Sequence, residues 1–266
     1  MAIAELASVD GRITATADAT ISLPDDGLYR GDGAFEVVRL YAGRPFALAA
    51  HLDRIERSAA AIELAVDRAA LEAELEPLLA RVSGDDGQLR IVLTRAGRRI
   101  LLTEPLPPWG ETLALATVTY SPSVILTGVK SISYAANMQA TRIAKRRGAD
   151  EALLVNPSGI VLEAPTSTIF WVTADGRYVT PKLEVGILES ITRAKLIAEL
   201  DVEEGTYELE ELLGASEAFL ASTTREVHGV SRIDDREIPA PGPRTLAAQE
   251  AFNAVVDREL AAEAKA

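Results

Sequence analysis

The chain has 266 residues, of which 48% are hydrophobic, enough to bury a large core that we expect to be divided between two domains. Its net charge of −13 argues against binding to a nucleic-acid backbone, because a phosphate-reading surface needs clustered lysine and arginine, so small molecules are the expected partners. The absence of cysteine excludes disulfide bonds and thiolate metal sites, and with only two histidines a multi-histidine metal cluster is not expected either.

Residues 1–118 are predicted to form a small N-terminal α/β domain. Apolar and polar residues alternate over 35–41, and the turn at 42–44 leads into 45–47, which predicts a strand hairpin. Apolar residues at helical spacing predict two helices, and further strands are expected on both sides of a polar, proline-rich stretch. The helices are expected over 52–62 and 71–78, ending near 84–87, the strands over 89–94 and 113–118, and the proline-rich stretch over 95–108.

A linker and a large C-terminal domain are expected to follow. Pro122 and its flanking serines interrupt the strand pattern over 119–127, which marks this segment as the crossing between the domains. The large domain is predicted to span 128–266. Its expected helices lie at 135–147, 191–200 and 242–264, and its expected strands at 151–155, 160–162, 169–173 and 218–222, with a turn at 156–159.

Lys130 is the first lysine of the chain, and its surroundings favour chemistry. It lies close to Val129 and Ile132 at the start of the predicted large domain. An ammonium flanked by apolar side chains is partly desolvated, which lowers its pKa and frees the amine for Schiff-base formation. The alternative is an ordinary solvated surface lysine, and the local context alone leaves that alternative open.

Short motifs before and after Lys130 resemble one enzyme family in their order. The motifs are GDGAFE (31–36), HLDR (51–54), YAAN (134–137), GADEALL (148–154), GIVLEAPTSTIF (159–170), TP (180–181), GIL (186–188), SITR (190–193) and STTREV (222–227). Over roughly residues 25–235 the chain resembles the class IV aminotransferases, which are pyridoxal 5′-phosphate (PLP) enzymes of fold type IV. The resemblance implies a two-domain α/β fold of the α+β type, like that of D-amino-acid aminotransferase, with PLP as cofactor.

PLP requires a lysine for its aldehyde, a partner for its pyridine nitrogen and anchors for its phosphate. The resemblance implies that Lys130 is the covalent tether and the general base, and that the Glu163 carboxylate keeps the pyridine nitrogen protonated. It also matches Tyr134 to a tyrosine that donates to the phenolate oxygen of the cofactor. Without the motifs, Glu163 would be taken for a solvent-facing residue at a strand end and Tyr134 for a core tyrosine.

Helix N-termini and short hydroxyl side chains suit a phosphate dianion, because backbone N–H groups and the helix dipole favour negative charge. The resemblance also assigns the phosphate to Arg54, whose guanidinium fork matches phosphate oxygens. Without it, Arg54 would be an exposed helix arginine and Ser190 an ordinary helix cap. The other phosphate residues that the resemblance implies are Ile191, Thr192, Ser222 and Thr223.

Phe35 is expected to line the substrate pocket. At its position typical D-amino-acid aminotransferases have a tyrosine whose hydroxyl helps to hold the substrate carboxylate. Because Phe35 lacks that hydroxyl, a cation elsewhere in the chain must take its role. Arg98 or Arg99 is the candidate, with a solvated charge run as the alternative. Ala164 and Thr168 depart from the glycine and asparagine that are common in the family. The remaining residues expected at the substrate are Thr166, Ser167, Thr168 and Thr224.

The motifs at 31–38 and 222–224 favour a D-amino-acid aminotransferase, which moves an amino group between a D-amino acid, with (R)-amines as further donors, and a 2-oxo acid. The segment 163–171 also resembles aminodeoxychorismate lyase, which releases pyruvate and forms 4-aminobenzoate. A branched-chain L-amino-acid aminotransferase and a PLP-binding protein without turnover are also compatible with the motifs. By analogy with enzymes that build the active site at a subunit boundary, a homodimer is expected. No apolar run of membrane-spanning length is present and the start of the sequence lacks a basic segment, so we expect a cytoplasmic protein without membrane contact.

Overall fold

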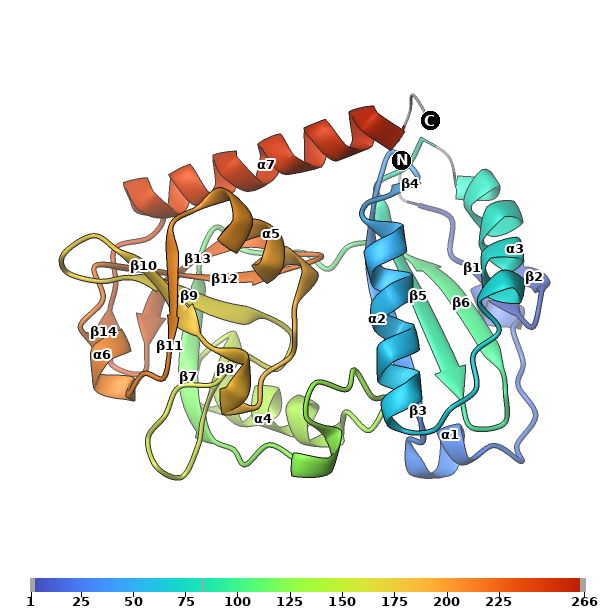
Figure 1. Cartoon of the computed structure of the whole chain (residues 1–266), viewed down its shortest axis with the longest axis horizontal. Coiled ribbons are helices and arrows are strands. Elements are labelled where there is room, and N and C mark those ends of the chain that lie inside the picture. Colours follow the sequence, from blue (N-terminus) through green and yellow to red (C-terminus); the bar gives the residue numbers. More distant parts are fainter. Residues whose placement is uncertain (1–2, 83, 264–266) are drawn as a thin grey trace. The chain divides into compact units, whose positions relative to one another are not determined.

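The structure is a computed structural model that describes residues 3–82 and 84–263. The chain divides into two compact units, whose elements are labelled in Figure 1. Unit 1 comprises the described residues up to Pro107, the segment Val129–Tyr134 and the described residues from Glu259 onward, and unit 2 comprises Pro108–Gly128 and Ala135–Arg258. No helix within the described residues has both the length and the apolar character that crossing a membrane requires.

Unit 1 is built on a six-stranded antiparallel sheet with the order β2-β1-β6-β5-β3-β4. The strands are β1 (Leu6–Val9), β2 (Arg12–Ala15), β3 (Gly33–Tyr41), β4 (Arg44–Pro45), β5 (Gly87–Thr94) and β6 (Arg99–Glu104). The predicted hairpin is present, with Tyr41 of β3 paired with Arg44 of β4. Ala42 and Gly43 at its tip have φ values of 48° and 78°, the left-handed geometry of a two-residue turn whose twist matches that of the strands.

Helices α2 (Leu48–Ala61) and α3 (Arg68–Leu79) cover one face of this sheet, as Figure 1 shows. The short helix α1 (Asp26–Arg30) lies against β5. The N-cap of α3 is Asp67, whose side chain accepts a hydrogen bond from the backbone N–H of Ala70. Each buried leucine or isoleucine of this face contributes roughly 1.5–3 kcal/mol. The core includes Val38, Leu40, Leu52, Ile55, Leu71, Leu75, Leu89 and Ile91.

Unit 2 is built on an eight-stranded mixed sheet. The strand order is β11-β10-β9-β12-β13-β7-β8, and β14 pairs with β13 beside this path. The pairs β7–β8, β13–β7 and β10–β11 are parallel, whereas the others are antiparallel. The strands are β7 (Leu113–Thr119), β8 (Glu151–Val155), β9 (Thr168–Val172), β10 (Tyr178–Pro181), β11 (Val202–Gly205), β12 (Glu217–Ser222), β13 (Glu226–Ile233) and β14 (Arg236–Glu237).

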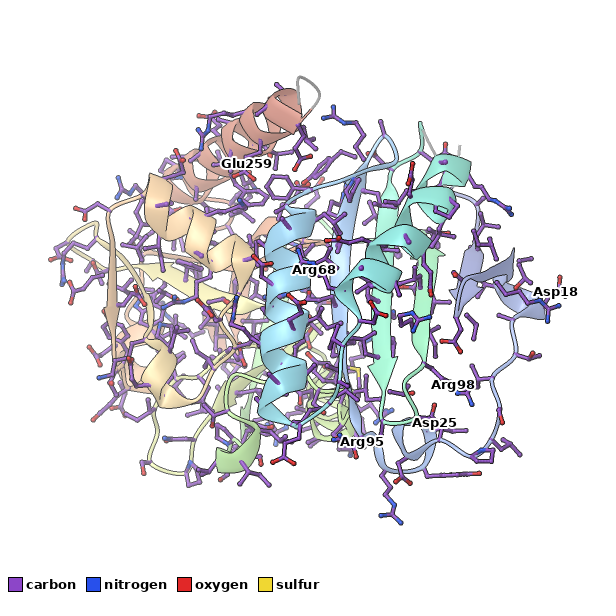
Figure 2. All side chains as sticks on the ribbon, turned by 45° about the vertical axis from the view of Figure 1, so that its right-hand side comes forward. Asp18, Asp25, Arg68, Arg95, Arg98 and Glu259 are labelled. Atoms are coloured by element: carbon purple, nitrogen blue, oxygen red, sulfur yellow. The ribbon has the colours of Figure 1, made fainter. Side chains whose placement is uncertain are left out.

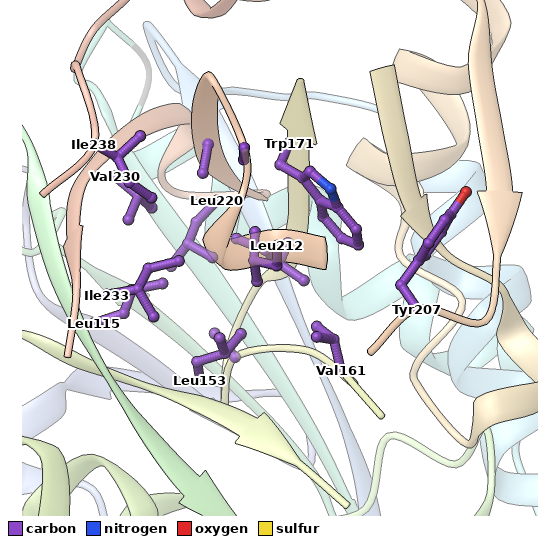
Figure 3. Close-up of a cluster of buried hydrophobic side chains, with 14 of the residues drawn as sticks. Leu115, Leu153, Val161, Trp171, Tyr207, Leu212, Leu220, Val230, Ile233 and Ile238 are labelled. Carbon is purple, nitrogen blue, oxygen red and sulfur yellow. The ribbon is translucent and has the colours of Figure 1, made fainter. Parts of the chain in front are cut away.

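Apolar side chains bury both faces of the unit 2 sheet. On one face, shown in Figure 3, Trp171 meets Tyr207 edge to face with ring centroids 4.9 Å apart. On the other face, Phe170 stacks on Phe219 with centroids 5.2 Å apart. Because successive residues of a strand point to opposite faces, β9 supplies Phe170 to one layer and Trp171 to the other. The cluster of Figure 3 includes Leu115, Leu153, Val161, Trp171, Tyr207, Leu212, Leu220, Val230, Ile233 and Ile238.

The helices of unit 2 are α4 (Ala135–Arg146), α5 (Ile191–Glu199), α6 (Leu209–Leu213) and α7 (Pro243–Glu263), of which α7 belongs to unit 2 up to Arg258. Helix α4 presents Ala140 and Ala144 to Ala116 and Ala152 of the sheet, and these small side chains allow close approach. Helix α5 packs against β12. The predicted helices at 135–147 and 191–200 are therefore present with ends shifted by a residue. The predicted helix at 242–264 is present as α7, and residue 264 lies outside the described residues.

The boundaries of the two units differ from the expected domains 1–118 and 128–266. Strand β7 was expected in the N-terminal domain, but it belongs to unit 2 because it pairs with β8 and β13. The segment Val129–Tyr134 was expected in the C-terminal domain, but it belongs to unit 1, where Ser131 forms an isolated bridge with Ala34. In both cases pairing partners far away in the sequence determine the unit to which a segment belongs.

Two local predictions also need correction. The stretch 95–108 was expected to be irregular, but Arg99–Glu104 forms β6, because it lies between β1 and β5 and pairs with both. Residues 160–162 were expected to form a strand. They form only isolated bridges, between Val155 and Val161 and between Ile160 and Glu208.

The start of α7 depends on one buried carboxylate. Glu217 accepts hydrogen bonds from the backbone N–H groups of Arg244 and Thr245, at 3.0 and 2.7 Å, and from the Thr245 hydroxyl at 2.8 Å. A Cβ at Gly242 would lie 2.2 Å from Cδ of Glu217. The carboxylate thus satisfies N–H groups that have no partner inside the helix, and Gly242 leaves room for it.

We therefore expect Glu217→Ala to lower the free energy of unfolding by about 2 kcal/mol, since it removes the cap and leaves buried N–H groups unpaired. Gly242→Ala should have a similar effect, because the carboxylate has to move. Urea unfolding followed by circular dichroism measures both. Glu250→Ala, at an exposed position within α7, is the control and should change the value by less than about 0.5 kcal/mol. Equal stability of Glu217→Ala and the control would contradict this role.

Candidate functional site

The backbone around Lys130 is held between β3 and α2 in unit 1. The Phe35 N–H donates to the carbonyl of Lys130 at 2.9 Å, and the Ile132 N–H donates to the carbonyl of Gly33 at 3.1 Å. The N–H of Lys130 donates to the hydroxyl of Ser58 at 3.1 Å. Lys130 is therefore attached to the regular structure on both sides although it lies outside the named strands.

Close packing at Gly33 makes this attachment possible. A Cβ at Gly33 would lie 2.2 Å from the carbonyl oxygen of Leu93 and 2.9 Å from Cδ1 of Ile132. Only a residue without a side chain lets β3 approach both β5 and the lysine segment this closely.

The Lys130 side chain lies against an aromatic ring that contacts a second one. Its Nζ is 4.2 Å from the ring centroid of Phe35, which is a cation–π distance. The ring of Tyr134 meets that of Phe35 edge to face at 5.3 Å. The fold thus brings together three residues that the sequence pattern singled out separately, and Lys130 itself is only partly exposed.

Arg54 is buried, so it is not an ordinary exposed helix arginine, and its guanidinium binds a carboxylate. Its Nε and Nη2 donate to the two oxygens of Glu36 at 2.6 and 2.7 Å. Nδ1 of His51, one turn earlier on α2, lies 2.7 Å from Oε2 of the same carboxylate. We call Glu36, His51 and Arg54 the buried ionic cluster. All three side chains are nearly inaccessible to solvent.

Glu36 was not among the predicted site residues, although the sequence contains a signal for it. On β3 it falls between Ala34 and Val38, so the period of two places its carboxylate on the face that carries the apolar core. A carboxylate on such a face requires cationic partners. The residues that provide them are far away in the sequence, and nothing in the local pattern identifies them.

The buried ionic cluster changes the protonation of its members. Burial alone would raise the pKa of Glu36, but hydrogen bonds from Arg54 and His51 and their positive charge lower the pKa to about 2. Burial lowers the pKa of His51 below its ordinary value, and the neighbouring Glu36 only partly opposes this. Near neutral pH the cluster therefore holds an ionised glutamate, a charged arginine and a largely neutral histidine.

Arg98 and Arg99 both bind carboxylates of unit 1. Nε of Arg98 donates to Oδ2 of Asp25 at 3.0 Å, and Figure 2 shows these two side chains near one another. Nε of Arg99 donates to Oε1 of Glu74 on α3 at 2.7 Å. Each guanidinium therefore already has an anionic partner within the unit.

Glu163 lies in unit 2 after the isolated bridge of Val161. Its carbonyl accepts a hydrogen bond from the N–H of Leu154 at 2.8 Å, which fixes its backbone beside β8. Its side chain is partly buried, and the N–H of Leu188 lies 3.3 and 3.4 Å from the two carboxylate oxygens. Burial and the charge of Glu163 raise the pKa of Tyr120. A backbone donor thus helps to hold the Glu163 carboxylate in place.

The phosphate candidates of unit 2 lie at a helix start and at a strand turn. Ser190 is the N-cap of α5 and accepts a hydrogen bond from the N–H of Arg193, and Ile191 and Thr192 begin the helix, with Thr192 buried. The first N–H groups of a helix are oriented toward any anion beyond its end. Ser222 ends β12, and Thr223 follows it in the tight turn to β13.

A second turn carries buried hydroxyls. Ala164 and Ser167 form an isolated bridge that closes the turn containing Thr166. The hydroxyls of Ser167 and Thr168 are buried and have no hydrogen-bond partner among the described residues. Buried polar atoms without partners are rare in folded proteins, so these hydroxyls indicate a polar ligand.

Known proteins share both the sequence pattern and the fold of this chain. A family model described as amino-transferase class IV matches residues 33–233. The chain is 30% identical to D-alanine aminotransferase of Bacillus licheniformis, over 95% of this chain and 97% of that protein. It is 31% identical to aminodeoxychorismate lyase of Bacillus subtilis, over 85% and 86%. It is also 31% identical to a putative branched-chain-amino-acid aminotransferase of Methanocaldococcus jannaschii, over 86% and 88%.

Among solved structures, the fold resembles the fold IV transaminase CpuTA1 from Curtobacterium pusillum. The TM-score is 0.84 at 26% identity, and the match covers 93% of this chain and 98% of that one.

The buried ionic cluster predicts a large stability loss in Glu36→Gln. The substitution keeps the shape of the side chain but leaves the Arg54 charge buried without its carboxylate, so the free energy of unfolding should fall by about 3 kcal/mol. Urea unfolding at pH 7 measures this. The control is Glu104→Gln, whose half-exposed carboxylate binds Arg90 at 2.9 Å, and it should cost less than about 1 kcal/mol. Losses of the same size in both variants would contradict the proposed role of the cluster.

The same cluster predicts a pH dependence of stability. Both His51 and Glu36 have a lower pKa in the folded than in the unfolded chain, so the unfolded chain takes up their protons first as the pH falls. Stability should decline below the ordinary His51 value of 6.5, and again from the ordinary Glu36 value of 4.5 toward about 2. Urea midpoints measured between pH 8 and pH 3 test this, and Glu36→Gln should show the shallower decline below pH 5.

Proposed function

Because the chain belongs to the class IV aminotransferases, we propose that it transfers an amino group between a D-amino acid and a 2-oxo acid. The observation that supports the D-amino-acid branch is the match to D-alanine aminotransferase, which extends over 95% of this chain, whereas the match to the lyase covers 85%. (R)-amines are further candidate donors.

The cofactor of this family is PLP, and the residues of this chain fit it. The start of α5 offers N–H groups for a phosphate, the Glu163 carboxylate offers an acceptor for a protonated ring nitrogen, and the hydroxyls of Ser167 and Thr168 are buried without partners. When bound, PLP supplies an electron-withdrawing ring that stabilises negative charge at the substrate α-carbon.

The proposed residue roles follow the family resemblance. The Nζ of Lys130 would hold the cofactor aldehyde covalently and would move a proton at the substrate α-carbon. Glu163 would hold the protonated ring nitrogen, and Tyr134 would donate to the phenolate oxygen. The proposed phosphate ligands are Arg54, Ile191, Thr192, Ser222 and Thr223. Glu36 and His51 act on Arg54 as positioning residues, because both contact its salt bridge.

The substrate side of the site rests on fewer contacts. Phe35 lies against Lys130 and is proposed to line the pocket. The other residues proposed at the substrate are Thr166, Ser167, Thr168 and Thr224. Arg98 and Arg99 were the sequence candidates for the substrate carboxylate, but each already binds a carboxylate of unit 1.

Aminodeoxychorismate lyase is the second candidate, because the relative from Bacillus subtilis is 31% identical. In that case the same lysine and glutamate would support elimination of pyruvate and formation of 4-aminobenzoate. A branched-chain L-amino-acid aminotransferase is the third candidate, and a PLP-binding protein without turnover is the fourth. We further propose a cytoplasmic homodimer, and sedimentation of a fully active monomer would contradict the dimer.

Trapping with borohydride tests the role of Lys130. Reduction of the holoenzyme should leave a pyridoxyl group on the peptide that contains Lys130, and an adduct on Lys145, Lys182 or Lys195, or no adduct, would contradict the assignment. Lys130→Ala should lower transamination about 10²- to 10⁴-fold, because the general base is lost. Lys145→Ala, exposed on α4, serves as the control and should keep full activity.

Two assays on the same holoenzyme distinguish the candidate reactions. We expect D-alanine to bleach the cofactor band and to yield a new amino acid when a 2-oxo acid is added. Pyruvate release from aminodeoxychorismate, without half-transamination of D-alanine, would establish the lyase instead. Reaction of branched-chain L-amino acids alone would favour the third candidate, and an unchanged spectrum with every amine would indicate binding without turnover.

A further inference from the structure

Arg225 is a buried arginine that follows the proposed phosphate residue Thr223 in the turn between β12 and β13. Its side chain is 5% exposed, and its Nη2 donates to Oε2 of Glu151 at 2.7 Å. Its guanidinium carbon lies 4.1 Å from the ring centroid of Trp109. The guanidinium is thus covered by an indole on its face and bound to a carboxylate through one of its two terminal nitrogens.

The other terminal nitrogen of Arg225, Nη1, is buried and has no hydrogen-bond partner among the described residues. Leaving a charged donor buried without an acceptor is costly, so native proteins seldom do it without a functional reason. The unpaired Nη1 therefore indicates an acceptor that belongs to a ligand.

The acidic neighbours of Arg225 already have partners. Glu151 accepts a hydrogen bond from the Thr141 hydroxyl at 2.6 Å besides that from Arg225. Asp150 accepts a hydrogen bond from the backbone N–H of Ala114 at 2.8 Å. His228, against the edge of Trp109, makes hydrogen bonds with the backbone of the adjoining loop. A missing acceptor for Nη1 must therefore come from outside this group.

We propose that Arg225 binds a carboxylate of the substrate through Nη1 and so selects amino and oxo acids over simple amines and ketones. This rests on the proposed function, because amino acids and 2-oxo acids both carry a carboxylate. A guanidinium N–H is well suited to that anion, since hydrogen bonds between ionised groups are short and strong. Arg225 shares its turn with Thr223, so the proposed substrate and cofactor contacts arise from one short segment.

Trp109 lies over one face of the Arg225 guanidinium. Its side chain is 39% exposed and lies in a stretch without helix or strand, whereas the Arg225 beneath it is buried. Because the indole lies over the guanidinium, a carboxylate bound to Nη1 should alter the environment of the indole. Trp171, the other of the two tryptophans in the chain, is buried in the core and should not respond.

The first test is kinetic and uses the holoenzyme. Arg225→Lys keeps the charge but loses the fork, and Arg225→Met combined with Glu151→Gln removes both charges, so that no carboxylate is left buried alone. We expect the KM for D-alanine and for the 2-oxo acid to rise about 10- to 100-fold, with cofactor retention unchanged. The value of kcat/KM for (R)-1-phenylethylamine, which has no carboxylate, should change less than about threefold.

The matched control is Arg244→Met. Arg244 also stacks on an aromatic ring, 4.2 Å over Tyr178, but donates to the carbonyl of Gly176 at 3.0 Å, and its loss should leave the KM values unchanged. Equal losses for the amine and the amino acid, or unchanged KM values in both Arg225 variants, would overturn the proposal. Loss of cofactor with unchanged KM would assign Arg225 to the cofactor phosphate instead and would also overturn it.

The second test does not depend on turnover, so it separates this proposal from the proposed function. Pyruvate should change the tryptophan fluorescence of the wild-type holoenzyme in a saturable manner, and butanone, an uncharged ketone, should not. The change should disappear in the Arg225→Met, Glu151→Gln variant and persist in Arg244→Met. A response to pyruvate in an enzyme that transaminates no D-amino acid would support Arg225 while rejecting the reaction. Identical responses in wild type and the Arg225 variant would reject the role of Arg225.

Discussion

The attachment of the Lys130 segment to β3 is the constraint on which the candidate site in unit 1 depends. Backbone hydrogen bonds in both directions join Phe35 and Gly33 to the segment, and the Ser58 hydroxyl accepts the N–H of Lys130. Because these are backbone contacts on a regular strand, the position of the lysine is determined by the sheet and not by a flexible loop. The Phe35 ring beside Nζ is carried by the same strand.

Both units contain a buried arginine bound to a buried glutamate. In unit 1, Glu36 accepts two hydrogen bonds from Arg54, and His51 contacts the same carboxylate. In unit 2, Glu151 accepts one hydrogen bond from Arg225, whose Nη1 has no partner among the described residues. Burying two opposite charges carries a larger desolvation penalty than pairing them at the surface. The penalty is offset only when every donor is satisfied. In the first pair both carboxylate oxygens accept hydrogen bonds from Arg54, whereas the second pair leaves a buried donor for a ligand.

Elements that depend on local pattern could be predicted from the sequence. The hairpin of β3 and β4, the helices α2, α3, α4 and α5, and most central strands have the expected alternation or helical spacing. Strand β6 was missed because Ile100, Leu101 and Leu102 lie between arginines and prolines, and only its pairing with β1 and β5 makes it a strand. The unit to which Lys130 belongs was not predictable for the same reason. The family motifs identified Arg54 and Glu163, but their hydrogen-bond partners lie too far away in the sequence for any spacing rule to find them.

The tight packing at Gly33 has a consequence for enzyme engineering. Any side chain there would meet the carbonyl of Leu93 at 2.2 Å, and the backbone cannot yield without separating two paired strands. A library that randomises the neighbourhood of the lysine to broaden its donor range should therefore leave position 33 unchanged and vary Phe35, whose ring lies on the opposite face of the same strand from Glu36.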